Sequence, residues 1–344
     1  MSQRSAIDPA AAALLVVLCA VWGAGQVAIK VGNQGISPLY HAAIRSAGAG
    51  LLVWGWSAWR GISLVRRDGT AVYGATIATL FALEFVCVYW GFMYTTASRG
   101  VLFIYAAPFF VALGAHWLFP AERLHGTKIA GLAVAFVGLS LAFADGLRLP
   151  TRLEVLGDVL ELAGAVLWAA TTLIIKARGQ ATTPHRTLFY QLAGSAVLLG
   201  ALAAVSGESG VTSLDAPVAV AVAYQVVALA FASYLAWFWL LTRYPASLLH
   251  AYTFWTPLFG LLAGWLLLSE PVTPALVLAM ACVALGIYLV NRQPNTAGAT
   301  REEPATLRAG AAGPGGRTGG GSPRSGAASG SAPCRRGPGA RGIR

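Results

Sequence analysis

Ten apolar runs, separated by short charged or Gly/Pro-containing breaks, fill residues 10–290 and restrict the fold of this chain more than any other feature. A helix needs about 20 mostly apolar residues to cross the hydrocarbon core of a bilayer, and each run is close to that length. Hydrophobic residues make up 57% of the chain and charged residues only 11%, whereas an ordinary soluble domain carries about 25% charged residues. The sequence therefore predicts an all-α polytopic membrane protein with ten transmembrane helices.

The predicted helices form two sets of five. Because nine further runs follow the first, we interpret the first run as a spanning helix and not as a cleaved signal peptide. The expected helices cover residues 10–29, 39–58, 71–93, 100–119 and 127–144 in the first set, and 156–175, 188–205, 217–241, 246–268 and 273–290 in the second.

The second set of helices repeats the first. Shifts of 146, 149 and 148 residues superpose Trp22 on Trp168, Lys30 on Lys176, Pro38 on Pro184, Gly48 on Gly194, Trp90 on Trp239, Tyr105 on Phe254, Pro108 on Pro257, Glu122 on Glu270 and Gly138 on Gly286. Five crossings is an odd number, so the second copy must enter the membrane from the opposite face. Inverted repeats of this kind are typical of many secondary transporters.

The distribution of basic residues predicts the orientation of the chain. With the N-terminus in the cytoplasm, the cytoplasmic segments before the C-terminal tail hold ten Lys and Arg residues and the opposite face holds four. This excess follows the positive-inside rule, in which cytoplasmic loops are enriched in Lys and Arg. The loop at residues 60–67 carries three Arg residues, whereas its repeat equivalent carries Glu208 and Asp215. We therefore expect both termini in the cytoplasm.

The expected organisation is a cytoplasmic N-terminus at residues 1–9, a first repeat at 10–144, a linker at 145–156, a second repeat at 157–291 and a tail at 292–344. Most of the net charge of +11 lies in the tail, which holds nine Arg residues against two Glu residues. Because the tail is rich in Gly, Pro, Ala and Ser and nearly free of large apolar residues, we expect it to be disordered. Its charge then indicates contact with anionic lipid headgroups at most, and no nucleic acid is expected as a partner.

The helical region, about residues 10–291, resembles the EamA-type members of the drug/metabolite transporter superfamily. The residues that carry the resemblance are Trp22-Gly23, Arg45, Tyr94-Thr95-Thr96-Ala97-Ser98, Pro108, Glu122-Arg123, Gly131 and Gly138 in the first copy, and Gly157-Asp158, Trp168, Ala246-Ser247, Pro257, Glu270 and Gly286 in the second. The resemblance implies a ten-helix carrier of the inner (plasma) membrane, commonly an exporter of metabolites such as amino acids, that works by alternating access. Where many relatives carry a small polar stretch with Ser or Asn after the Trp-Gly pair, this chain has Ala24-Gly25-Gln26.

Two matched prolines are predicted to break helices. Pro108 and Pro257 lie inside the fourth and ninth expected helices, where proline removes a donor and clashes with the carbonyl four residues earlier. Lipid cannot satisfy such a carbonyl, so breaks occur mainly where protein or a watery cavity can. Matched breaks in the two copies indicate a solute site at the repeat interface, and a packing kink without ligand contact is the alternative interpretation.

Aromatic side chains near these breaks could line a cavity for a neutral or aromatic solute, because small-molecule sites combine apolar walls with a few polar groups. Interfacial belts and helix packing are the alternative roles. The candidate solute-binding residues, with the intramembrane polar residues discussed next, are Trp22, Gln26, Arg45, Glu84, Tyr105, Trp168, Tyr252 and Trp255.

Two of the charged residues within predicted spans, Arg45 and Glu84, are candidate functional groups. Arg45, about two turns into the second helix, would contact a substrate carboxylate, pair with an acid or extend to the interface. Glu84 lies near the middle of the third helix, where an acid should face the protein interior. It is expected to act in proton coupling or in binding a substrate amine, unless it forms a structural ion pair with Arg45. Lys30 and Lys176 end equivalent helices and are interpreted as helix-end anchors.

The leading hypothesis is a secondary transporter, because the chain lacks the GxxxxGK[ST] sequence that binds ATP. A membrane-embedded enzyme would need HExxH, GxSxG or a similar catalytic set, and the chain has none. A channel would be expected to line its pore with charge rings or a multi-subunit filter. The scattered Cys and His residues indicate neither a metal site nor a disulfide framework, and no cofactor is expected. The expected partners are a small-molecule solute and the lipid bilayer, with proton coupling and a homodimer left open.

Overall fold

The structure is a computed structural model that describes residues 6–64, 68–144, 147, 149–178, 182–268 and 274–292. The predicted disordered tail, most of the N-terminal segment and part of the linker at 145–156 lie outside the described residues. The helices are α1 (Pro9–Gly32), α2 (Pro38–Trp59), α3 (Thr70–Tyr94), α4 (Ala97–Ile104), α5 (Ala107–Leu118), η1 (Pro120–Glu122), α6 (Gly126–Ala142), α7 (Arg152–Arg178), α8 (Pro184–Val205), α9 (Ala216–Tyr224), the π-helical η3 (Gln225–Ser233), α10 (Tyr234–Leu241), α11 (Ala246–Tyr252), α12 (Trp255–Leu268) and α13 (Pro274–Asn291).

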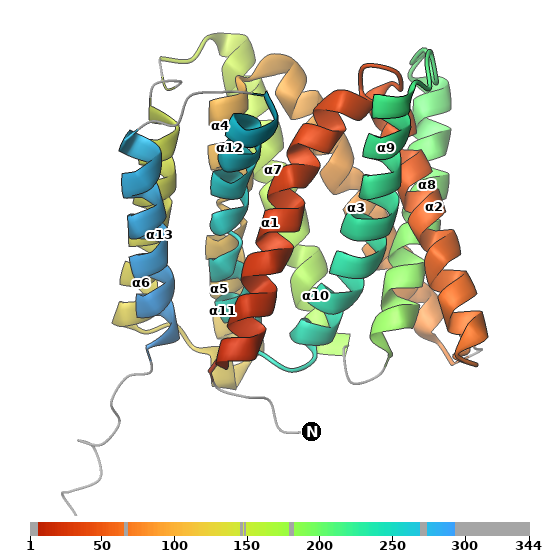
Figure 1. Ribbon diagram of the computed structural model, residues 1–344. Coiled ribbons are helices and arrows are strands. Elements are labelled where there is room, and N and C mark those ends of the chain that lie inside the picture. Colours follow the sequence, from red (N-terminus) through yellow and green to blue (C-terminus); the bar gives the residue numbers. More distant parts are fainter. Residues whose placement is uncertain are drawn as a thin grey trace, which may run out of the picture. The chain divides into compact units, whose positions relative to one another are not determined.

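The described residues contain helices and no strand, apart from one isolated bridge between Ile36 and Val211. The predicted all-α class is thus confirmed. Figure 1 shows the helices side by side, with the start of α1 and the end of α13 at the same end of the bundle. We call this end the terminal end and the other the distal end.

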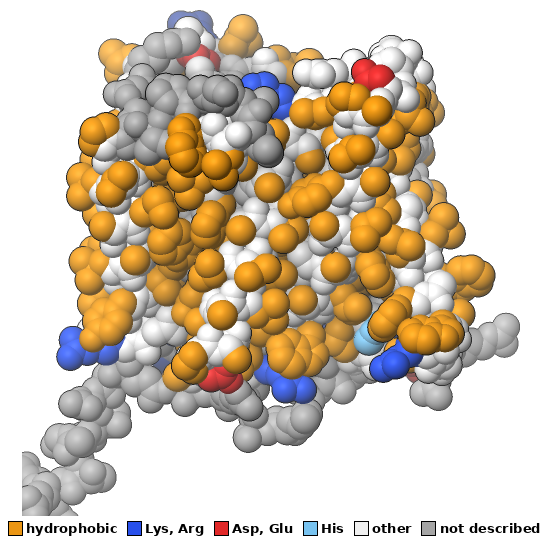
Figure 2. Space-filling view, in the orientation of Figure 1, with side chains coloured by type: hydrophobic (Ala, Val, Ile, Leu, Met, Phe, Trp, Pro, Cys, Tyr) orange, Lys and Arg blue, Asp and Glu red, His pale blue; other side chains and the backbone are white. Residues whose placement is uncertain are grey.

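Seven helical stretches of the described chain are long and apolar enough to cross a membrane, and the apolar helix Gly126–Ala142 is shorter. The long stretches are Pro9–Gly32, Thr70–Tyr94, Arg99–Leu118, Arg152–Arg178, Pro184–Val205, Ala216–Leu241 and Pro274–Asn291. Figure 2 shows hydrophobic side chains over the middle of the visible face and charged side chains near its two ends. This distribution is that of a protein surface facing lipid between two polar layers.

Two of the predicted helices are interrupted. One stretch divides into α4 and α5 at Tyr105-Ala106, and another divides into α11 and α12 at Thr253-Phe254. Each interruption precedes a proline, Pro108 or Pro257, at the second or third residue of the following helix, where the missing proline N–H removes no helical hydrogen bond. A third long helix changes to π-helical geometry over η3, between α9 and α10.

Glycines allow the closest helix contacts. A Cβ added to Gly131 in α6 would lie 2.6 Å from the carbonyl oxygen of Gly286 in α13. A Cβ on Gly23 in α1 would similarly lie 2.7 Å from backbone atoms of α12. Small residues let membrane helices pack through their backbones, since lipid supplies no hydrophobic drive between helices. These contacts fix α6 against α13 and α1 against α12.

Candidate functional site

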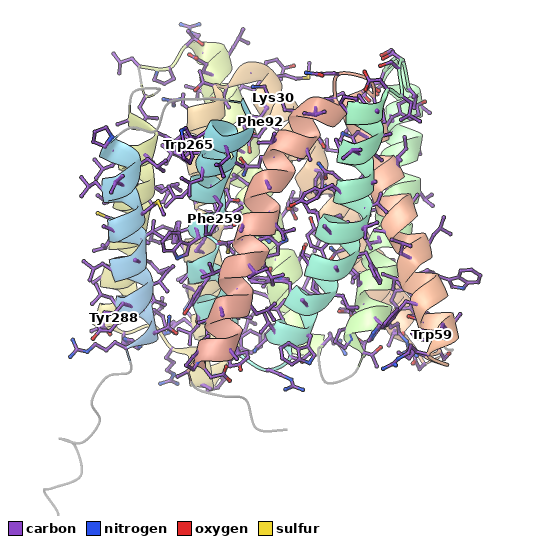
Figure 3. The ribbon with its side chains drawn as sticks, in the orientation of Figure 1. Lys30, Trp59, Phe92, Phe259, Trp265 and Tyr288 are labelled. Atoms are coloured by element: carbon purple, nitrogen blue, oxygen red, sulfur yellow. The ribbon has the colours of Figure 1, made fainter. Side chains whose placement is uncertain are left out.

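A cavity of about 610 Å³ lies among α1, α2, α3, α4, α7, α8, η3, α10 and α12. At one end it is lined by Lys30 and Phe92, both exposed, so it reaches the surface there. Figure 3 shows these two residues near the distal end, opposite Trp59 and Tyr288. The deep end is lined by the buried side chains of Thr172 and Trp237. The cavity is therefore open at the distal end and closed toward the terminal end.

Aromatic rings form much of the deep wall. Trp22 donates its indole N–H to the hydroxyl of Ser233 at 2.7 Å, and its ring meets that of Trp237 edge to face at 5.1 Å. Tyr105, at the interruption between α4 and α5, packs edge to face on Trp168 at 5.9 Å. Edge-to-face pairs at these distances are favourable and hold rings in fixed orientations. The wall is thus a rigid aromatic surface to which both halves of the chain contribute.

Arg45 projects from α2 toward this cavity and is 2% exposed. Its guanidinium lies 4.2 Å from the centre of the Phe85 ring, and its Nε and Nη2 atoms have no hydrogen-bond partner among the described residues. A buried cation without an anion is costly, and a cation–π contact offsets only part of that cost. Arg45 therefore presents unsatisfied donors to whatever occupies the cavity.

Glu84 lines the same cavity from α3. Its side chain is half-buried, and its Oε2 atom is buried without a hydrogen-bond partner among the described residues. No ion pair joins Glu84 to Arg45 within the described part of the chain. The cavity thus holds a cation and an acid on neighbouring helices that do not neutralise each other directly.

Neutral polar groups complete the cavity. Gln191 of α8 is the repeat counterpart of Arg45, and its Oε1 atom is buried without a partner among the described residues. Gln26 of α1 and Thr171 of α7 also line it. A few polar groups in an apolar cavity of this size are typical of small-molecule sites.

Six of the eight residues predicted as solute contacts line this cavity: Trp22, Gln26, Arg45, Glu84, Tyr105 and Trp168. Tyr252 and Trp255 do not. The carbonyl of Tyr252 accepts a hydrogen bond from the Cys19 thiol, and the Trp255 ring stacks on Phe259. Pro108 and Pro257 lie outside the lining too, but the interruptions before them place Tyr105 and Thr256 in it.

A buried polar cluster lies near the C-terminal end of α7, between the cavity and the terminal end. Lys176 is 5% exposed and donates to the carbonyls of Leu241 and Tyr244. Its Nζ atom lies 3.7 Å from Oε1 of Glu122. The other oxygen of Glu122 accepts from both the backbone N–H and the hydroxyl of Ser247. The interpretation of Lys176 as a helix-end anchor is wrong, because its ammonium is inside the protein.

The sequence interpretation also missed Glu161. This acid lies within α7 and is 0% exposed, and its only available signal was an acid inside the apolar run at 156–175. Among the described residues, no group of three or more His, Cys, Asp or Glu side chains could hold a metal ion.

Comparisons with known proteins identify one family of transporters. A model of the EamA-like transporter family matches residues 10–144 and again residues 155–292. An uncharacterized transporter of Archaeoglobus fulgidus is 25% identical over 81% of this chain and 96% of its own length. A protein of Escherichia coli K12 named a probable amino-acid metabolite efflux pump is 28% identical over 80% of this chain and 92% of its own. One crystal structure shares the fold, with a TM-score of 0.71 at 18% identity over 80% of this chain and 96% of that one.

Proposed function

Since the chain belongs to the EamA-like transporter family, which its two family matches show, we propose that it is a secondary transporter that exports a small organic solute. The family and the relatives it matches are transporters and not enzymes, and the protein is an integral membrane transporter. An amino acid or a related metabolite is the proposed solute class, as in the name of the relative from Escherichia coli.

The cavity is the observation that carries this proposal. A zwitterionic solute has a carboxylate and an ammonium group, and the cavity offers unpaired Arg45 and Glu84 on adjacent helices. Aromatic rings of Trp22, Tyr105 and Trp168 supply the apolar wall for the rest of the solute. Binding energy would come from charge-assisted hydrogen bonds between these two groups and the charged ends of the solute.

We further propose ten crossings arranged as two inverted repeats at residues 10–144 and 157–291, with α4–α5, α9–α10 and α11–α12 each acting as one crossing. The helix contacts support a two-fold relation: the equivalent helices α6 and α13 pack together, and so do α2 and α8. The contact of α3 with α7 likewise has a counterpart in that of α1 with α9 and η3. Alternating access in such proteins is largely a rocking of one repeat against the other.

In this arrangement the terminal end faces the cytoplasm of a cell whose inner membrane holds the protein, and the cavity opens outward. The cluster of Glu122, Lys176 and Ser247 then closes the cytoplasmic side. Labelling with a membrane-impermeant thiol reagent in intact cells tests the orientation. A cysteine placed near Glu208 should react and one placed in the tail should not, and equal labelling of the two would contradict the inverted repeats.

Transport itself is tested with purified protein in liposomes. A thermal-shift screen with amino acids, nucleosides and aromatic metabolites identifies the solute, because a ligand of the native state raises its stability. Flux of that solute should saturate with solute concentration and should be driven by a pH gradient. A conductance that does not saturate would instead support the alternative of a channel.

A further inference from the structure

Glu161 is an acid inside the bundle that the solute cavity does not use. It lies about two and a half turns into α7 and is 0% exposed. Neither of its carboxylate oxygens has a hydrogen-bond partner among the described residues. A buried carboxylate without donors loses its hydration and gains nothing in return. An acid kept in that position needs a ligand, and a proton is the smallest one that removes the charge.

The packing of α3 against α7 makes a closed compartment for this side chain. A Cβ added to Gly91 of α3 would lie 2.7 Å from Oε1 of Glu161, so the missing side chain at Gly91 provides the space. One turn earlier on α7, Gly157 packs against the backbone of Thr95 and Gly91. One turn later, Gly164 packs against the side chains of Val88 and Ile104. Close packing at Gly157 and at Gly164 thus encloses Glu161 from both sides.

The charged and titratable groups near Glu161 do not neutralise it. On α7 itself, Asp158 lies one turn away on the same face and exerts a repulsive electrostatic effect on Glu161. On α4, Arg99 is bound to Asp158, which also accepts the Thr95 hydroxyl at 2.6 Å. The other titratable groups on these two helices are Tyr73, Glu84, Cys87, Tyr89 and Tyr94 on α3, and Arg152, Glu154, Lys176 and Arg178 on α7. The cations among them lie near the two ends of α7, at least nine residues from Glu161, and none forms an ion pair with Glu161 among the described residues.

The position of Glu161 connects the cavity with the distal end. Cys87 of α3, one turn from the cavity acid Glu84, lies within electrostatic range of both Glu84 and Glu161. The Asp158–Arg99 ion pair lies on the other side, one turn closer to the distal start of α7. Acidic side chains arranged in this way inside membrane helices commonly mark proton pathways.

We propose that Glu161 is a proton-binding site at the α3–α7 interface and that it carries the coupling proton of the transport cycle, a role that rests on the proposed transporter function. In the packed state the carboxyl holds one proton. When α3 and α7 separate and water enters, that proton leaves as hydronium and a carboxylate remains. Uptake of one proton from the other side restores the neutral acid and lets the helices close.

Infrared difference spectroscopy of the reconstituted protein tests the proton site without any solute. A spectrum recorded between neutral and alkaline pH should contain the C=O stretch of a protonated acid, and Glu161→Gln should lose one such band. Glu208→Gln, which removes an acid from an outer loop, should keep it. An identical difference spectrum for wild type and Glu161→Gln would overturn the proposal. If the Gln variant does not fold, Glu161→Met, which is uncharged and of similar size, takes its place.

Transport assays test the coupling role separately, with the amino acid that gives the largest saturable wild-type flux as the probe. Glu161→Gln should lose pH-driven uptake down to the level of empty liposomes but keep exchange of labelled for unlabelled solute, which needs no net proton movement. Glu161→Asp should regain part of the pH-driven uptake.

If wild type and Glu161→Gln show the same saturable, pH-driven flux, the inference fails and the proposed function stands. If no probe gives saturable flux in wild type, the proposed function and the coupling role fail together, and the infrared band alone decides the proton site.

Discussion

Lys176 and Glu122 form an ion pair inside the protein, with 3.7 Å between Nζ and Oε1 and side chains that are 1% and 0% exposed. Lys176 lies in the last turn of α7, and Glu122 lies in η1, 54 residues earlier in the chain. Ser247 of α11 and Lys128 of α6 add hydrogen bonds to the same cluster. Elements from both halves of the chain therefore meet at one buried charge pair, and this makes the terminal end of the cavity a closed one.

Breaking this pair should strongly destabilise the protein. Glu122→Gln and Lys176→Met are each expected to lower the free energy of unfolding by about 3–5 kcal/mol, because each leaves one buried charge without its partner. The double variant should lose less than the sum of the two. Lys30→Met removes the exposed lysine at the equivalent place in the first repeat and should change stability by less than about 0.5 kcal/mol. Thermal denaturation in detergent compares the stability of these four variants with that of wild type. Equal stability of Lys176→Met and Lys30→Met would contradict the burial of Lys176.

The packing of α6 against α13 gives a second prediction. Gly131→Ala should destabilise the protein by about 1–3 kcal/mol, because the new methyl group would overlap the backbone of α13. Gly55→Ala is the matched control, since a Cβ at that position in α2 meets nothing within 4 Å. It should be neutral or slightly stabilising, because alanine is the better helix former. If the two variants denature at the same temperature, that result would contradict the close contact between Gly131 of α6 and Gly286 of α13.

Helix positions could be predicted well from the sequence, because the length of an apolar run and the place of a proline are local features that determine where a helix begins and ends. The expected third helix at 71–93 corresponds to α3 (Thr70–Tyr94), and the interruptions before Pro108 and Pro257 follow from the geometry of proline. The π-helical geometry of η3 has no such local signal, since its residues are apolar like those around them.

Side-chain partners were harder to predict, because they depend on which helices come together. A lysine at the end of a helix has the same local sequence whether it faces lipid or a buried glutamate, so the burial of Lys176 required the fold. Tyr252 and Trp255 lie near a helix interruption, as the cavity residue Tyr105 does, yet they point elsewhere. Their role as solute contacts stays a prediction.

A third prediction concerns Asp68, in the loop between α2 and α3 outside the spanning segments. The hydroxyl of Thr70 and the guanidinium of Arg186 hold the pKa of Asp68 at about 2. A pKa lowered by folding stabilises the protein at pH values above the unfolded pKa of about 3.9, and this stabilisation is lost as the pH falls toward about 2. Asp68→Asn should therefore lower the denaturation temperature at neutral pH, and the difference from wild type should shrink below about pH 4.

Salt provides the control for this prediction. Because the Asp68 side chain is 36% exposed in this ion pair, added salt should screen its attraction to Arg186 and reduce the difference between wild type and Asp68→Asn. The same denaturation experiment at low and high ionic strength measures the effect. A difference that is independent of both pH and salt would mean that the substitution acts on the loop in some other way.

The last prediction concerns Glu84, the acid that lines the cavity and forms no ion pair with Arg45 among the described residues. Its repeat counterpart is Ser233, which accepts the indole N–H of Trp22, so the second half of the chain keeps a polar group there without the charge. Placing a carboxylate near the centre of a bilayer costs about 2.5–3.5 kcal/mol, and acids kept at such positions usually have a function.

Glu84→Gln keeps the shape of the side chain and removes its charge. It should insert and fold as wild type does, because no partner is left unpaired, while solute flux collapses or loses its pH dependence. A raised KM in exchange assays would assign Glu84 to the substrate amine, and an unchanged KM with lost pH dependence would assign it to the proton. Measured in the same liposomes, flux and a pH profile equal to those of wild type would exclude both roles.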